Sequence, residues 1–229
     1  MITLAALTLD LDDTLWPVWP AIERAEARLI AWLAEHAPAT AAAHDRKTLR
    51  LLRDAVAAEQ PGWAHDLSRI RLESIRRALQ QHDEDPALAE AAFEAFFEER
   101  QRVDLFADVL PALDRLAARW PIVAVSNGNA DVGRVGLGRY FRASVSAREF
   151  GRGKPEAAIF HHACSLAGAA HGAVLHIGDD GVLDVDGALG AGLRAAWIER
   201  PDLPPPAAPR GTPHHRIADL LTLADQLGA

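Results

Sequence analysis

Two carboxylates placed two residues apart, Asp10 and Asp12, begin the first of four polar clusters in this chain of 229 residues. Asp10 ends a mostly apolar run, residues 3–10, which is typical of a buried parallel strand whose carboxyl end opens onto a site. Two acids at such a place could divide the labour of a group transfer, one as an ionised nucleophile and the other as a proton donor and acceptor. The alternative is an acidic turn that caps a helix, because Asp is common in turns.

The second and third clusters could hold an anion. Residues 126–129 (SNGN) follow an apolar run, and a hydroxyl beside a glycine that admits backbone N–H groups suits a phosphoryl group. In residues 151–155 (GRGKP), Lys154 precedes a predicted helix whose electropositive N-terminus also favours an anion. Each cluster has an ordinary alternative, a common loop opening for the first and an exposed lysine for the second.

The fourth cluster, residues 178–184 (GDDGVLD), holds three carboxylates in a tight turn. Asp179, Asp180 and Asp184 would repel one another unless a cation lies among them, and hard oxygen ligands favour Mg²⁺ over zinc. The alternative is a helix N-cap, which Asp184 in particular could provide. All four clusters fall at predicted strand ends, and the carboxyl ends of parallel strands meet at one edge of a sheet. This conjunction favours a single shared site.

A parallel sheet must position these clusters. From about residue 105, strand-like runs alternate with helical segments, which indicates βαβ units and a sheet with helices on both faces. Strands are predicted at 121–126, 143–146, 173–178 and 194–198, and helices at 107–119, 131–139, 155–167 and 184–191. The proline-rich stretch 201–213 is predicted to be a surface loop before a last helix, 217–227.

The segment after the first strand has a helical pattern for about ninety residues instead. Four helices are predicted there: one around residues 22–33, one at 47–60, one around 67–79, and one that starts with Asp85 as N-cap and Pro86 at its first position. We expect a Rossmann-like α/β core, residues 1–15 and 105–229, with an all-helical domain, residues 16–104, inserted over the functional edge as a cap.

The composition limits the function classes. With 24 Lys and Arg against 32 Asp and Glu, the net charge is −8, and the chain lacks the broad basic surface that nucleic-acid binding needs. The single cysteine, Cys164, excludes an intramolecular disulfide and a cysteine-rich metal site. No apolar run approaches a membrane span, and the N-terminus lacks the basic region of a signal peptide. We expect a cytoplasmic protein that binds neither nucleic acid nor membrane, as a monomer or a dimer.

The order of the motifs resembles the haloacid dehalogenase (HAD) superfamily. Asp-x-Asp-x-Thr, a serine after a strand, Lys-Pro and Gly-Asp-x4-Asp follow one another, and the helical insertion is similar to the type 1 cap. The resemblance implies that Asp10 attacks phosphorus to form an aspartyl-phosphate, and that Asp12 protonates the leaving alcohol and later activates water. It also implies phosphoryl contacts from Ser126, Asn127 and Lys154, a Mg²⁺ ion held by Asp10, the Asp12 carbonyl and Asp179, and supporting roles for Thr14, Asp180 and Asp184.

Asp12 separates the activities within this superfamily. Its dehalogenases lack the second aspartate because a halide leaving group needs no proton, whereas an alkoxide does, so a phosphatase is favoured. A phosphomutase or phosphotransferase would use the same motifs. A non-catalytic phosphate-binding module with a phosphorylatable aspartate is the alternative from another class.

Several local strings are similar to those of the bacterial flavin mononucleotide (FMN) and pyrimidine phosphatases, which act on FMN and on the ribityl-aminopyrimidine phosphate of riboflavin synthesis. They lie at residues 10–16, 126–130, 136–141, 176–180 and, in the insertion, 65–71. A small organic phosphate is the substrate that this resemblance implies. His65 and Arg69, four residues apart, are predicted to share a helix face that could meet the leaving group. Trp16 or Trp63 could stack on an aromatic ring.

Overall fold

The computed structural model describes residues 3–204 and 207–229. Met1, Ile2 and residues 205–206 of the predicted proline-rich loop lie outside the described residues. The chain forms two compact units: one runs up to Pro17 and resumes at Asp104, and the other is Val18–Val103. Each unit has its own cluster of buried apolar side chains. The first is called the α/β unit below and the second the helical unit.

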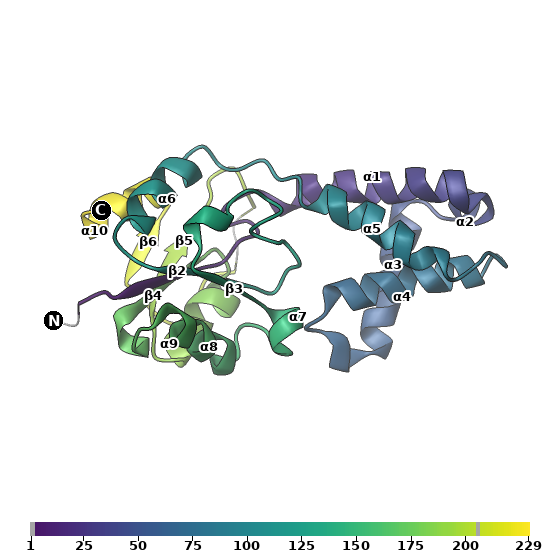
Figure 1. The fold of residues 1–229 in the computed structure, drawn as a ribbon. Coiled ribbons are helices and arrows are strands. Elements are labelled where there is room, and N and C mark those ends of the chain that lie inside the picture. Colours follow the sequence, from purple (N-terminus) through teal and green to yellow (C-terminus); the bar gives the residue numbers. More distant parts are fainter. Residues whose placement is uncertain (1–2, 205–206) are drawn as a thin grey trace. The chain divides into compact units, whose positions relative to one another are not determined.

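The α/β unit contains a six-stranded, fully parallel sheet with the order β3-β2-β1-β4-β5-β6 (Figure 1). The strands are β1 (Ala6–Leu9), β2 (Ile122–Ser126), β3 (Ala143–Ser146), β4 (Val174–Gly178), β5 (Arg194–Ile198) and β6 (His215–Ile217). The four central strands are apolar along almost their whole length, as expected of a sheet covered on both faces. The predicted fold class, a parallel α/β sheet of Rossmann type with inserted helices, is confirmed.

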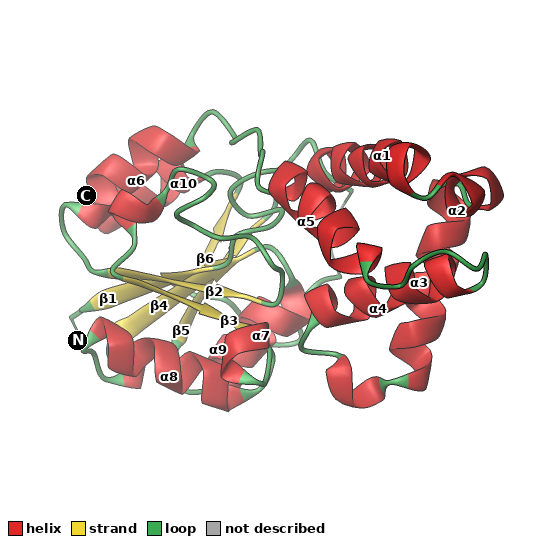
Figure 2. Ribbon diagram, turned by 45° about the vertical axis from the view of Figure 1, so that its right-hand side comes forward, coloured by secondary structure: helices red, strands yellow, loops and turns green. Residues whose placement is uncertain are grey.

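Helices cover both faces of this sheet. On one face lie α7 (Ala147–Phe150), α8 (Ala157–Ala167) and α9 (Gly187–Gly190), and on the other α6 (Val109–Ala117) and α10 (Leu220–Leu227) (Figure 2). Short 3₁₀ turns occur at Gly138–Tyr140 and His171–Ala173, and a π-helical turn, η4, spans Gly181–Asp186. Phe160 and Cys164 of α8 are fully buried in the core, so the lone cysteine packs as a small apolar side chain.

One predicted helix of the α/β unit is wrong, and another begins later than predicted. The helix predicted at residues 131–139 is absent: Asp131 Oδ1 accepts hydrogen bonds from the backbone N–H groups of Gly133 and Arg134, and Gly136 has a φ of 82°. Such a local turn competes with helix formation, and a left-handed residue ends it. The last helix begins at Leu220 rather than at 217, because residues 215–217 instead extend the sheet as β6.

The helical unit contains five α-helices where four were predicted. They are α1 (Val18–His36), α2 (Pro38–Ala43), α3 (Arg46–Glu59), α4 (Leu67–Gln80) and α5 (Leu88–Arg100), with a 3₁₀ turn, η1, at Pro61–Trp63. Pro38 follows the end of α1 and occupies the first position of α2, where a proline is tolerated. Asp85 accepts from the backbone N–H of Ala87 in a turn, and α5 begins only at Leu88, so the predicted N-cap is wrong.

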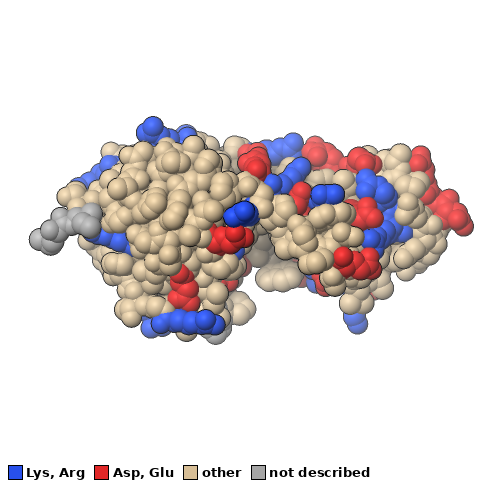
Figure 3. Space-filling model, turned by 90° about the horizontal axis from the view of Figure 1, so that it is seen from below, with Lys and Arg blue, Asp and Glu red and all other residues tan. Residues whose placement is uncertain are grey.

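Packing of α1 and α4 against α5 makes the core of the helical unit. Leu29 and Leu33 of α1 are buried, as their helical spacing predicts, together with Ile75 of α4 and Phe96 of α5. On the molecular face shown in Figure 3, basic and acidic side chains are interspersed. Within the described residues, no helix combines the length and the apolar character that crossing a membrane requires.

Candidate active site

All four polar clusters line one cavity of about 170 Å³ in the α/β unit. Because β2, β1 and β4 are parallel neighbours, the loops that leave their carboxyl ends meet at one edge of the sheet. The structure therefore brings together the residues that the sequence placed at separate strand ends. The lining residues are Asp10, Asp12, Ser126, Asn127, Gly128, Lys154, Asp179, Asp180, Leu183 and Asp184.

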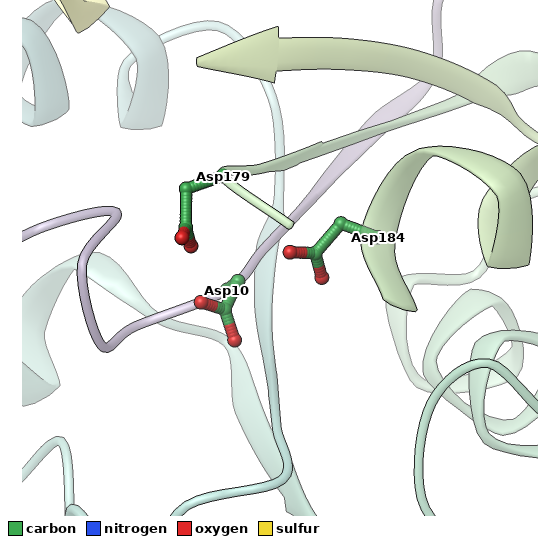
Figure 4. A group of neighbouring side chains, drawn as sticks. All are labelled: Asp10, Asp179 and Asp184. Carbon is green, nitrogen blue, oxygen red and sulfur yellow. The ribbon is translucent and has the colours of Figure 1, made fainter. Parts of the chain in front are cut away.

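Three carboxylates form the floor of this cavity. Asp10 directly follows β1, Asp179 directly follows β4, and Asp184 comes from η4; their side chains point toward one another (Figure 4). One oxygen of each lies within 4.8 Å of the others, so the three could hold a metal ion. Lys154 Nζ lies 2.5 Å from Asp10 Oδ1 and 2.5 Å from Asp184 Oδ1, and its side chain is buried. One cation thus faces three acids.

The buried charges shift the proton affinities of this group in opposite directions. Burial raises the pKa of Asp10 well above its usual range, although Lys154 opposes this, and burial raises the pKa of Asp179 to about 7, with the charge of Asp184 adding to it. For Asp184, burial is outweighed by Lys154 and His176, which hold its pKa well below the usual range. Burial alone would lower the pKa of Lys154, but Asp10 and Asp184 raise it.

A buried histidine, missed in the sequence, orients Asp184. His176 Nε2 lies 3.0 Å from Asp184 Oδ1, and its Nδ1 lies 2.9 Å from Thr8 Oγ1. Since a carboxylate can only accept, Nε2 carries the hydrogen and Nδ1 accepts from the Thr8 hydroxyl. Burial lowers the pKa of His176, in keeping with a neutral ring. Thr8 and His176 are paired in register on the neighbouring strands β1 and β4. The sequence signal that could have found them is that each is the one polar side chain in an otherwise apolar strand.

Thr14 joins two of the acids. Its buried hydroxyl lies 3.0 Å from Asp179 Oδ1 and 3.3 Å from Asp10 Oδ2, and it donates to both. A hydroxyl shared in this way fixes the distance between two carboxylates while neutralising neither. Thr14 does not line the cavity itself, but it contacts two acids that do.

Asp12 is held at one oxygen by an indole. Trp16 Nε1 donates to Asp12 Oδ1 at 2.9 Å, and the Trp16 side chain has no exposed surface. A ring without exposed surface has no face for a ligand, so stacking on an aromatic substrate, predicted for Trp16, is not possible in this structure. A Cβ atom at Gly128 would lie 2.4 Å from Asp12 Oδ2. Only glycine at this position leaves room for the second carboxylate oxygen.

Asn127 contacts the main chain of Lys154 on both sides. Asn127 Nδ2 donates to the Lys154 carbonyl at 2.9 Å, and the Lys154 N–H donates to Asn127 Oδ1 at 2.8 Å. A Cβ atom at Gly153 would lie 2.6 Å from that same Oδ1, which explains why glycine precedes the lysine here. Ser126 Oγ lies on the cavity wall and accepts from the Gly128 N–H at 2.9 Å.

Asp180 and Asp184 have different surroundings. Asp180 is the N-cap of η4, where its Oδ1 accepts from the N–H groups of Val182 and Leu183. Asp184, which the sequence allowed as a helix cap, instead holds Lys154 and His176, and its Oδ2 accepts from the Asp180 N–H. A Cβ atom at Gly178 would lie 2.2 Å from the Asp184 carboxyl carbon, so the glycine makes room for this carboxylate.

In the helical unit, the predicted shared face of His65 and Arg69 is wrong. Asp66 caps α4 by accepting from the Arg69 N–H at 2.9 Å, so the helix begins at Leu67 and His65 precedes it. An N-cap residue has non-helical backbone angles, and His65 therefore does not continue the helical repeat. Arg69 lies instead over the Trp63 ring, with its guanidinium carbon 3.8 Å from the ring centre.

The protein is therefore an α/β protein with a parallel sheet, and the cavity at the carboxyl edge of the sheet holds several aspartates, two of which are bridged by a lysine. Residues 4–192 match the family model of haloacid dehalogenase-like hydrolases, and the chain belongs to that family. The predictions that the chain is a HAD-superfamily member and an enzyme of the hydrolase class are thereby confirmed.

Three relatives extend this comparison. The chain is 36% identical over 226 residues to the 5-amino-6-(5-phospho-D-ribitylamino)uracil phosphatase YigB of Escherichia coli. The alignment covers 96% of this chain and 94% of that protein. It is 33% identical to a phosphoserine phosphatase of Thermus thermophilus, over 64% of this chain and 60% of that protein. A structure described as a 2-haloacid dehalogenase from Pseudomonas syringae superposes with a TM-score of 0.90 at 35% identity and covers 99% of both chains.

Because the pKa shifts of Asp179 and Asp184 are opposite, replacing each residue by asparagine should change the stability of the protein in opposite directions. A raised carboxyl pKa destabilises the native state above that pKa, so Asp179→Asn should raise the melting temperature of the metal-free protein at pH 8, by about 2–4 °C for each kcal/mol of repulsion relieved. The gain should shrink as the pH falls from 8 through 7, because Asp179 then becomes protonated in the native wild type.

Asp184→Asn is the matched variant. A lowered carboxyl pKa stabilises the native state at neutral pH, and this contribution is lost only in acid, so Asp184→Asn should lower the free energy of unfolding at pH 8 by about 3 kcal/mol. Thermal unfolding of both variants in chelator, between pH 5 and pH 8, measures the two signs. Equal signs would contradict this account of the charges.

Proposed function

We propose that this protein is a Mg²⁺-dependent phosphomonoester hydrolase that works through an aspartyl-phosphate on Asp10. The observation that carries the proposal is the presence of a second carboxylate, Asp12, in the same cavity as Asp10 and Lys154. This arrangement supplies a nucleophile, a proton donor for an alcohol and a cation for an anionic substrate. Phosphoryl transfer requires little beyond in-line positioning and charge stabilisation.

The proposed reaction has two steps. A carboxylate oxygen of Asp10 forms a bond to phosphorus while the bond from phosphorus to the alcohol oxygen breaks, and Asp12, in its acid form, gives its proton to the departing oxygen. A water molecule then bonds to phosphorus, its proton passes to the Asp12 carboxylate, and the bond to Asp10 breaks to release phosphate. The hydrogen bond from Trp16 holds Asp12 while it gains and loses this proton.

The phosphoryl oxygens are proposed to contact Lys154 and Ser126, both of which line the cavity. Asn127 was predicted as a third phosphate ligand, but its side-chain amide contacts the Lys154 main chain. We therefore propose that the Asn127 side chain positions Lys154. Lys154 lies between Asp10 and Asp184, so a phosphoryl group at Asp10 would lie within reach of its charge.

The donor set fits Mg²⁺. All of the candidate ligands are hard oxygen atoms, and three acids against one lysine leave the floor of the cavity with a negative charge that a divalent cation would balance. We propose Asp10, Asp179 and the Asp12 carbonyl as the protein ligands, with Asp184 as a support because Lys154 and His176 already occupy its Oδ1. When bound, Mg²⁺ would reduce repulsion between the anionic nucleophile and an anionic substrate.

FMN or 5-amino-6-(5-phospho-D-ribitylamino)uracil is the proposed substrate. The support is the 36% identity to the E. coli phosphatase, which extends over nearly the full length of both proteins. Other small organic phosphates are the nearest rivals, because a phosphoserine phosphatase is 33% identical over part of the chain. In the helical unit, the Trp63 ring under the Arg69 guanidinium is the proposed recognition element for an aromatic substrate.

A panel of phosphate esters tests this proposal. The panel contains FMN, the ribitylamino-uracil phosphate, phosphoserine and sugar phosphates. Inorganic phosphate should be released in the presence of Mg²⁺ and not in the presence of chelator. Asp10→Asn should abolish the release, because an amide is not a nucleophile. Halide release from a 2-haloacid without phosphatase activity would favour the dehalogenase. An isomeric phosphate product would favour a mutase.

The role of Asp12 predicts a dependence on the leaving group. Asp12→Asn should lower kcat by about 10²–10⁴-fold for an alkyl phosphate, whose alkoxide needs a proton. With p-nitrophenyl phosphate, whose phenolate leaves without one, the first step should stay fast, and a burst of p-nitrophenol should precede slow turnover. Asp13→Asn is the control for the loss of a neighbouring charge and should keep the wild-type ratio of the rates for the two substrates. If Asp12→Asn slows the first step equally with the alkyl phosphate and with p-nitrophenyl phosphate, Asp12 is not the proton donor.

Trp63→Ala tests substrate recognition by the helical unit. If the indole stacks on an isoalloxazine or pyrimidine ring, kcat/KM for FMN should fall by about 10-fold while that for a sugar phosphate stays within about twofold. Trp19→Ala is the matched control, because Trp19 is an exposed indole of the same unit with an arginine, Arg50, above its ring. An unchanged preference for FMN over the sugar phosphate in Trp63→Ala would exclude stacking.

A further inference from the structure

An arginine outside the cavity contacts the loop of residues 11–16, which follows Asp10 and is called the catalytic loop below. Arg200 follows β5 and is 6% exposed. Its Nε and Nη2 donate to the Thr14 carbonyl at 3.1 and 2.6 Å, and its Nη1 donates to Asp108 Oδ1 at 2.8 Å. The guanidinium also lies over the Phe106 ring, 4.1 Å from its centre. The ion pair with Asp108 uses only Nη1, whereas the other two donors of the guanidinium both bind the Thr14 carbonyl.

The carbonyl that Arg200 holds belongs to the residue that links two acids. Thr14 donates its hydroxyl to both Asp10 and Asp179, so the position of its backbone determines where that hydroxyl lies. The next carbonyl is also fixed, because the Phe106 N–H donates to the Leu15 carbonyl at 3.1 Å. Asp108, the other partner of Arg200, accepts from the Leu220 N–H at the start of α10. The catalytic loop is thus held directly by Arg200 and by the Phe106 N–H, and Asp108 links Arg200 to the start of α10.

We infer that Arg200 is a positioning residue for the proposed phosphoryl transfer: it holds Thr14, and through Thr14 it sets the separation of Asp10 and Asp179. The inference rests on the proposed function. Arg200 does not line the cavity that contains Asp10 and Lys154, so it acts on the geometry of the nucleophile and leaves substrate binding unchanged. Displacement of a reacting group by about 1 Å can cost about 100-fold in rate.

A second cavity makes this inference testable. It has a volume of about 430 Å³ and is lined in part by Arg200, Asp108 and Phe106. If the arginine side chain is removed, a free guanidinium ion has a route to the vacated position, where it meets the Thr14 carbonyl, the Asp108 carboxylate and the aromatic ring. A planar cation with several donors can replace these contacts, whereas urea lacks the charge.

The experiment compares Arg200→Ala with the wild type on p-nitrophenyl phosphate. We expect kcat to fall by about 10–100-fold and KM to stay within about threefold, because the nucleophile is misplaced and the substrate still binds. Guanidinium chloride, well below concentrations that unfold the protein, should restore kcat, and urea at the same concentration should not. Arg115→Ala is the matched control, because Arg115 pairs with Asp225 near the C-terminal ends of α6 and α10, contacts neither Thr14 nor Asp108, and should show neither loss nor rescue.

Hydrogen–deuterium exchange gives a readout independent of activity. The catalytic loop contains the bonds from Asp13 N–H to the Trp16 carbonyl and from Leu15 N–H to the Leu11 carbonyl. Amides of residues 11–16 should exchange faster in Arg200→Ala, and guanidinium should slow them again. If the wild type releases no phosphate from any ester, the proposed function fails, and the exchange measurement still tests the contact between Arg200 and the loop.

Arg200→Lys covers the case in which the alanine variant does not fold. Lysine keeps a charge for Asp108 but cannot place two parallel donors on the Thr14 carbonyl, so kcat should again fall with KM unchanged. Wild-type kcat in either variant, a loss of kcat without faster exchange in residues 11–16, or a loss that guanidinium does not restore would overturn the inference.

Discussion

The repulsion between like charges is the constraint on which this structure depends. Asp10, Asp179 and Asp184 each bring an oxygen within 4.8 Å of the others. At such a distance, each pair of unit charges costs about 3–4 kcal/mol at an effective dielectric constant of 20. Lys154 offsets part of this by bridging Asp10 and Asp184, whereas burial and, after it, the charge of Asp184 keep the pKa of Asp179 raised. A divalent cation beside Asp179 would relieve the repulsion, so the same feature that destabilises the metal-free protein favours metal binding.

The scaffold holds the site mainly by its backbone. Asn127 contacts both main-chain groups of Lys154, Arg200 holds the Thr14 carbonyl, and Trp197 Nε1 donates to the Asp179 carbonyl at 2.7 Å. Each contact fixes the position of a loop without occupying the side chain that the loop carries. The carboxylates of Asp10 and Asp179 accept hydrogen bonds from Lys154 and Thr14, and both face the cavity. Asp184 Oδ1 accepts from both a lysine and a histidine, and its proposed role is accordingly that of a support.

The sequence predicted the parts of this site that local patterns encode. Apolar runs ending in acids or in Ser-Asn-Gly marked the carboxyl ends of β1, β2 and β4, and the parallel topology then required them to meet. Contacts between distant residues could not be found in this way. Thr8 and His176 are 168 positions apart and Thr14 and Arg200 are 186 apart, and only the folded sheet makes them neighbours. The helix predicted at 131–139 failed for a local reason, because Asp131 and three glycines favour turns over a regular helix.

The choice between an alcohol and a halide as leaving group depends on the position of one side chain. Trp16 Nε1 donates a hydrogen bond to one oxygen of Asp12, and the other oxygen faces the space that Gly128 leaves for it. This contact fixes the orientation of the carboxylate and therefore the direction in which it can present a proton to the cavity. A halide has no use for that proton, so in a dehalogenase such an acid would only add charge to an already acidic site. The resemblance of the fold to a structure described as a dehalogenase therefore says less about the chemistry than this one carboxylate does.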